Sequence, residues 1–179
     1  MPIEECQVNI RQLVPPEKRK VCQEDVISLG DLHSNPMKLL HTLAHYGIID
    51  ISEDVFSALW ALYDAMPIDI DDPIKADKAI VLFNQFAQLI EPLVLTHPGL
   101  LIFIGDELAD RGKNDLLMLF VFKKLHDSKL PYWIQLSNHG LQALAHFEKA
   151  SLEPLMKGQE QSLDALIQLE NHVPMLYEF

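Results

Sequence analysis

The chain has 179 residues, of which 49% are hydrophobic and 22% charged, and its formal net charge is −12 at pH 7. This composition favours one globular domain with a hydrophobic core, and no apolar run is long enough to span a membrane. The acidic balance argues against a nucleic-acid partner. With two cysteines and no signal-peptide pattern at the N-terminus, we expect a protein of a reducing compartment, the cytoplasm.

The predicted elements alternate between strands and helices. Residues 1–24 are expected to form an irregular leader, and apolar runs predict strands at 25–29, at 100–104 and at the start of the segment PYWIQLSNHG. Helical spacing and boundary residues predict helices from Pro36 to Gly47, from Ser52 to Pro67, over 74–91, over 114–127 and over much of the remaining chain to Phe179, with a loop at DIDDP.

This alternation predicts an α/β layered fold with mainly parallel strands, formed by residues 1–179 as a single domain. Helices are expected on both faces of the sheet, and residues 48–97 are expected to form a helical insert between the first and second strands. Ligands of such sheets gather at the carboxyl ends of the strands.

A polar cluster follows each predicted strand, within the segments GDLHSN, GDELADRG and SNHG. Their carboxylate, amide and imidazole groups suit Mn, Fe or Zn, and a bridging aspartate can hold two such ions for phosphoester hydrolysis. A nearby arginine offers a bidentate fork for phosphate. The candidate residues are Asp31, His33, Asp106, Asp110, Arg111, Asn138 and His139.

The three segments resemble the motifs GDxHG, GDxxDRG and GNHD or GNHE of the calcineurin-like metallophosphoesterases, which include the PPP-type Ser/Thr phosphatases. The resemblance covers residues 25–140. The second motif and the helical insert also resemble the WipA-type phosphatases that intracellular bacteria secrete as effectors. The resemblance implies a phosphorylated substrate, such as a phosphoprotein. It also implies delivery into a host cell as the alternative to a cytoplasmic location.

The resemblance also implies roles for individual residues. Asp31 and His33 would bind the first metal, and Asp106 would bridge both metals. Asn138 would bind the second metal and the phosphate. His139 would be the general acid, oriented by Asp110, while Arg111 would bind the phosphate. The metals would activate the attacking water.

Departures from the family motifs also carry predictions. Ser34 and Ser137 stand in place of glycines, which is tolerable if the backbone there avoids positive φ. Gly140 stands in place of an acidic residue. The extra residue in GDELADRG requires a bulge if Arg111 is to bind phosphate.

The resemblance implies that the chain covers only the N-terminal half of the family fold. The family takes two more metal-binding histidines from the segment after the third motif. His146 and His172 do not fit that pattern, so we expect an incomplete second metal site.

Two classes of function stay open: a metal-dependent phosphoester hydrolase, and a degenerate relative that uses the scaffold as a binding module. Some residues have simpler interpretations. His41 and His45 have metal-pair spacing but are expected to be ordinary helix histidines, and His126 a helix-end residue. Glu107 and Asp115 are expected to be solvated carboxylates without a role.

Overall fold

The computed structural model describes residues 9–13, 25–67, 73–96, 99–108, 114–135 and 137. The expected leader, the DIDDP loop and the helices expected after the third strand therefore lie wholly or mostly outside the described residues, as do both cysteines. Within the described residues the structure contains three strands and four helices. No described helix is long and apolar enough to cross a membrane.

The three predicted strands form one parallel sheet with the order β1-β2-β3. Strand β1 comprises Val26–Leu29, β2 comprises Leu100–Phe103 and β3 comprises Tyr132–Ile134. Ile27 pairs with Leu101, which in turn pairs with Tyr132. The prediction of parallel strands is confirmed, and the three carboxyl ends consequently lie at one edge of the sheet.

Three of the four helices begin directly after a capping residue. Asn35 and Ser52 accept hydrogen bonds from backbone N–H groups in the first turns of their helices, and Asn114 does the same further along the chain. The helices are α1 (Pro36–His45), α2 (Glu53–Ala65), α3 (Pro73–Ile90) and α4 (Asp115–Asp127).

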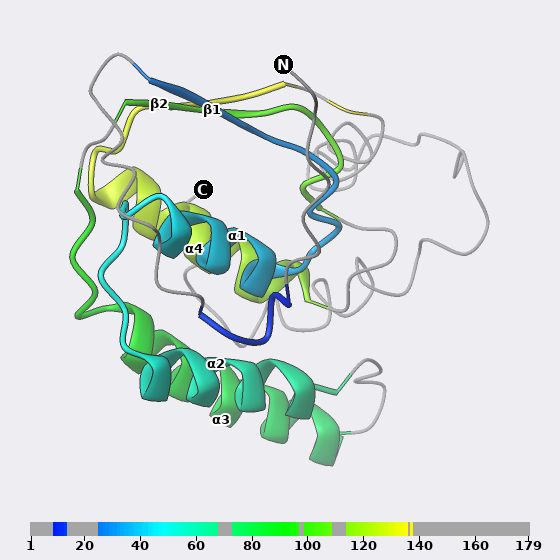
Figure 1. Cartoon of the computed structure of the whole chain (residues 1–179). Helices are drawn as coiled ribbons and strands as arrows, with labels where there is room; N and C mark the ends of the chain where they lie inside the picture. The colour runs from blue at the N-terminus through cyan, green and yellow to red at the C-terminus, as the bar shows by residue number, and fades with distance from the viewer. Residues whose placement is uncertain are drawn as a thin grey trace, which may run out of the picture.

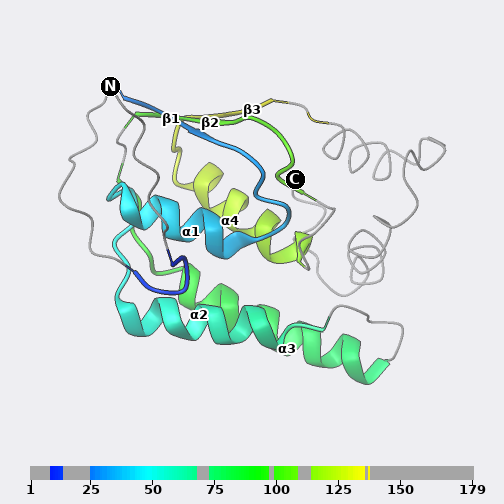
Figure 2. The ribbon, with the colours of Figure 1, turned by 45° about the vertical axis from the view of Figure 1, so that its right-hand side comes forward.

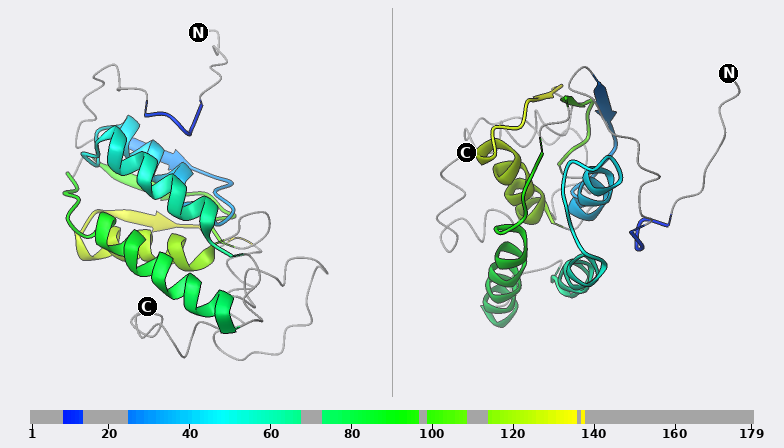
Figure 3. Two further views of the ribbon diagram at one scale, coloured as in Figure 1. Left: turned by 90° about the horizontal axis from the view of Figure 1, so that it is seen from below. Right: turned by 60° about the vertical axis from the view of Figure 1, so that its left-hand side comes forward.

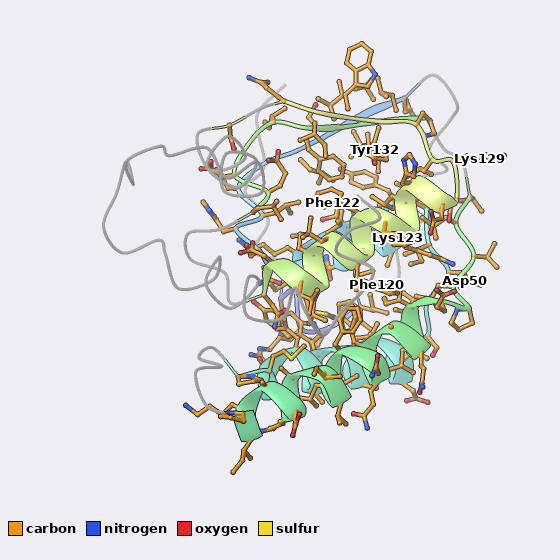
Figure 4. All side chains as sticks on the ribbon, turned by 180° about the vertical axis from the view of Figure 1, so that it is seen from behind. Asp50, Phe120, Phe122, Lys123, Lys129 and Tyr132 are labelled. Atoms are coloured by element: carbon orange, nitrogen blue, oxygen red, sulfur yellow. The ribbon has the colours of Figure 1, made fainter. Side chains whose placement is uncertain are left out.

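The elements form three layers (Figures 1 and 2). The sheet lies on α1 and α4, and these two helices lie on α2 and α3, as the end-on view of Figure 3 shows. Helix α4 is buried on both sides: the Phe122 ring packs 4.9 Å from that of Phe103 in the sheet, and the Phe120 ring packs 5.4 Å from that of Phe83 in α3. Figure 4 shows Phe120 and Phe122 on opposite sides of the helix. The buried leucines and phenylalanines of α4 are therefore part of the core.

The predicted helical insert contains α2 and α3, and its two ends lie side by side. Ile49 and Leu95 form an isolated antiparallel bridge, and the Thr96 N–H donates to the Ile48 carbonyl at 2.8 Å. Gly47, with φ of 68°, provides the left-handed turn between α1 and the insert. The insert thus extends the helical layer without interrupting the sheet.

All four described helices lie on the same side of the sheet (Figure 2). Several apolar side chains are exposed at the strands, among them Val26 at 57% and Trp133 at 68%. The expectation of helices on both faces therefore holds for one face in the described part of the chain.

Candidate metal centre at the carboxyl edge of the sheet

Two loops form the candidate site. The first loop, residues 30–35, joins β1 to α1, and the second loop, residues 104–108, follows β2. Leu32 is buried at 3% exposure and anchors the first loop in the core. Because Leu32 is directed inward, its neighbours Asp31 and His33 are available at the edge of the sheet.

Backbone hydrogen bonds join the two loops beyond the end of the strands. The N–H groups of Asp31, His33 and Ser34 donate to the carbonyls of Gly105, Asp106 and Glu107, at 3.2, 2.7 and 2.9 Å respectively. These bonds extend the contact between β1 and β2 past the last strand residues. Main-chain hydrogen bonds thus hold the first and second motifs side by side, in addition to the pairing of the two strands that precede them.

Two glycines are required where the motifs turn. A Cβ atom on Gly30 would come 2.9 Å from Cγ1 of Ile104, which is closer than real Cβ contacts allow. Gly105 has a φ of 122°, a conformation that L side chains rarely adopt. Steric constraints therefore explain why a glycine precedes the aspartate in both motifs.

The residues after these glycines have an unusual backbone conformation. Asp31, His33, Ser34 and Asp106 all have φ between 48° and 54°. Each non-glycine residue in this left-handed region costs about 1–2 kcal/mol. Ser34 does not meet the condition under which a serine was expected to be tolerated in place of glycine, because its φ is positive and a glycine would adopt this conformation more easily.

Asp31, His33 and Asp106 come together as a group that could hold a metal ion. One ligand atom from each lies within 4.8 Å of the others, and Nε2 of His33 lies 3.9 Å from Oδ1 of Asp31. Ligands that bind at 2.0–2.2 Å from a common ion lie about 3–4.4 Å apart, so small side-chain movements would suffice. Two carboxylates and an imidazole form a donor set that suits Mn, Fe or Zn. These residues therefore fit a divalent cation.

Figure 4 shows Asp50, an exposed carboxylate, at the far side of the molecule from the carboxyl ends of the strands. It belongs to the short connection between α1 and α2 and has no place in the candidate cluster. Asp50 therefore offers a matched control for substitutions of Asp31 or Asp106.

Glu107 and Asp115 are buried, at 3% and 2% exposure, and the prediction that they are solvated carboxylates is wrong. Oε1 of Glu107 accepts a hydrogen bond from the Gly105 N–H at 2.8 Å. Asp115, in the first turn of α4, accepts a hydrogen bond from the Ser34 hydroxyl. Sequence reasoning missed both because charged residues are rarely buried without a partner, and the partners come from distant segments or from backbone.

The remaining predicted site residues lie outside the described residues. They are Asp110, Arg111, Asn138 and His139, together with His146 and His172. Ser137, at the third strand end, is described, and its Cβ would lie 3.4 Å from a Cβ placed on Gly105. The third motif thus begins beside the turn of the second.

Three other histidines lie where they were expected, on helices. His41 is buried and its ring lies 6.1 Å from that of Phe56, with a tilted geometry. Burial lowers the pKa of His41, against the opposing effect of a hydrogen bond with the Gln12 backbone. His45 is exposed beside Tyr46, and His126 lies in the last turn of α4.

Comparison with protein families gives a match over part of the chain. Residues 100–174 match the family model described as "WipA-like, phosphatase domain". The matched segment includes β2, α4 and β3 and the second and third motifs. It therefore covers two of the three sequence segments on which the resemblance was based.

A solved structure then supports the particular branch. The fold is similar to that of the phosphatase domain of the Legionella effector WipB, with a TM-score of 0.67 and 27% sequence identity. The match covers 79% of this chain and 53% of that one, so the chain spans about half the length of the solved domain. The two matches confirm the predicted resemblance to the WipA-type effector branch of the phosphatases. No curated protein matches the chain.

Proposed function

We propose that the chain is a divalent-metal-dependent phosphoester hydrolase that acts on a phosphorylated substrate, with phosphoproteins as the preferred class. The observation that carries this proposal is the cluster of Asp31, His33 and Asp106 at the carboxyl ends of two adjacent parallel strands. The match to a WipA-like phosphatase domain supports the same reaction.

The described residues have distinct tasks in this proposal. Asp31 and His33 hold the cation from the first loop, and Asp106 holds it from the second. The main-chain hydrogen bonds between the loops fix the spacing of the ligands before the ion arrives. When bound, the cation supplies Lewis-acid stabilisation of phosphoryl oxygens and lowers the pKa of water.

The residues outside the described part keep the roles that the family resemblance implies. Asn138 holds phosphate and a second ion, His139 donates a proton to the leaving oxygen with Asp110 orienting it, and Arg111 binds phosphate. His146 and His172 do not fit the pattern of the two histidines that the family uses to bind the second ion. We therefore expect one ion to bind more tightly than the second, and turnover to be slow.

The test is hydrolysis of p-nitrophenyl phosphate by the full chain, with and without Mn²⁺. We expect slow, Mn²⁺-dependent turnover that Asp106→Asn abolishes and Asp50→Asn leaves unchanged. Asp106→Asn keeps size and hydrogen-bonding capacity but loses the charge that binds the ion. Turnover in Asp106→Asn equal to that of the wild type, or no turnover in any metal, would contradict the hydrolase proposal.

Arg111 has a test of its own. If it binds the phosphoryl group, Arg111→Ala should raise the phosphate concentration needed for half-maximal inhibition and leave the Mn²⁺ content unchanged. Loss of metal together with loss of fold in Arg111→Ala would instead show a structural role.

A further inference from the structure

A buried hydrogen bond joins the first loop to the start of α4. The Ser34 hydroxyl donates to the Asp115 carboxylate, and the two side chains come from positions 81 residues apart in the chain. Ser34 is 0% exposed and Asp115 is 2% exposed. A hydrogen bond to a carboxylate in such a setting is stronger than one between neutral groups.

The backbone conformation of Ser34 is costly for a residue that has a side chain. Its φ of 54° lies in the region that favours glycine. A glycine would relieve the backbone cost but would remove the hydroxyl and leave the buried carboxylate of Asp115 without this donor. The hydrogen bond therefore offsets a local conformational cost that the chain could otherwise avoid.

The position of the bond connects it with the metal ligands. Ser34 directly follows His33, and the N–H groups of both residues donate to carbonyls of the second loop. Its partner Asp115 is the first residue of α4, a helix packed in the core. The bond thus anchors the ligand-bearing loop to a rigid element at a point one residue from the imidazole.

We propose that Ser34 and Asp115 are positioning residues for the metal centre. They hold His33 and, through the interlocked loops, Asp31 and Asp106 in the arrangement that binds the cation. Neither side chain belongs to the ligand cluster itself. This inference rests on the proposed metal-dependent function, and its experiment separates the two.

The first measurement is Mn²⁺ affinity by isothermal titration on the full chain. We expect Ser34→Gly to weaken Mn²⁺ binding about tenfold, the lower end of the effect of losing a group that orients a ligand. Asp115→Leu should do the same. Asp115→Asn keeps an oxygen that accepts from the Ser34 hydroxyl and should bind Mn²⁺ nearly as well as the wild type.

A matched control uses Ser52, the serine that caps α2. Ser52 caps α2 by accepting a hydrogen bond from the Val55 N–H at 3.3 Å, away from the site. Ser52→Ala should lower the melting temperature but leave Mn²⁺ affinity unchanged. A common loss of affinity in Ser34→Gly and Ser52→Ala would show that affinity merely follows global stability, which would overturn the proposal.

The second measurement is hydrogen exchange of the metal-free chain. In Ser34→Gly, the backbone amides of His33 and Asn35, on either side of the substitution, should exchange faster. The amides of α2 should keep their wild-type rates. Unchanged exchange at His33, or wild-type Mn²⁺ affinity in Ser34→Gly, would overturn the proposal. If the wild type binds no Mn²⁺, the proposed function fails, and the exchange rates alone decide whether this bond orders the loop.

Discussion

The carboxyl edge of the sheet and the helical insert follow opposite structural rules. At the edge, four non-glycine residues have positive φ and two carboxylates are buried. In the insert, α2 and α3 are regular helices, and no described residue from 48 to 96 has positive φ. The insert obeys local propensities, whereas the edge departs from them at the candidate ligands Asp31, His33 and Asp106 and at Ser34. Such departures concentrate at functional sites.

The largest effect on stability is expected in the insert. Phe56 is fully buried, and its ring lies 6.5 Å from that of Trp60 and 6.1 Å from that of His41. Phe56→Ala should lower the free energy of unfolding by about 3–5 kcal/mol because it leaves a cavity. Urea denaturation measures this loss. If the two regions have separate tasks, the folded fraction should keep its Mn²⁺ affinity, and a weaker affinity would break the comparison.

A smaller stability loss is expected at the edge, but with a second consequence. Glu107→Ala removes the acceptor of the Gly105 N–H and should cost about 1–3 kcal/mol. Since Asp106 lies between these two residues, Mn²⁺ affinity should fall as well. Glu107→Gln keeps the accepting oxygen and serves as the control. Unchanged affinity in Glu107→Ala would show that this side chain stabilises the loop without shaping the site.

The helix caps allow a direct comparison of the two regions. Asn114 caps α4 beside the site, with its Oδ1 accepting from the Leu117 N–H at 3.2 Å, while Ser52 caps α2 in the insert. Replacement of either by alanine should cost about 1 kcal/mol. Thermal melts should show similar losses, but only Asn114→Ala should weaken Mn²⁺ binding, because it loosens the start of α4. Equal Mn²⁺ affinities in the two variants would contradict this distinction.

The smallest expected effect is a pH dependence of the free energy of unfolding, which arises from His41 where it packs against Phe56 of the insert. Burial lowers the pKa of His41 below its usual value of 6.5. The unfolded chain therefore binds the proton more readily, and stability should fall as pH decreases below about 6.5. His41→Gln should reduce the difference in unfolding free energy between pH 7.5 and 5.5. The exposed His45→Gln should keep it, and an equal reduction in both variants would exclude His41 as the source.

The sequence was sufficient to predict the regular elements in the described part of the chain. Each described helix has apolar spacing and a capping or boundary residue, such as Ser52 for α2, and these local signals act over a few positions. The convergence of Asp31, His33 and Asp106 from the first two motifs also followed, because parallel strands place their carboxyl ends at one edge.

The environment of Ser34, Glu107 and Asp115 could not be predicted in the same way. The bond between Ser34 and Asp115 joins residues 81 positions apart, and the φ of Ser34 depends on the neighbouring loop. No local pattern distinguishes a carboxylate that is buried by such contacts from one on the surface.

The most direct test of the account is the Mn²⁺ content of the full chain after equilibrium dialysis, measured for the wild type, Asp106→Asn and Asp50→Asn. Because Asp31, His33 and Asp106 form the cluster at the sheet edge, we predict about one tightly bound Mn²⁺ per chain in the wild type. Asp50→Asn should match the wild type, and Asp106→Asn should retain little or no ion. Equal Mn²⁺ content in all three proteins would contradict a metal centre at this edge.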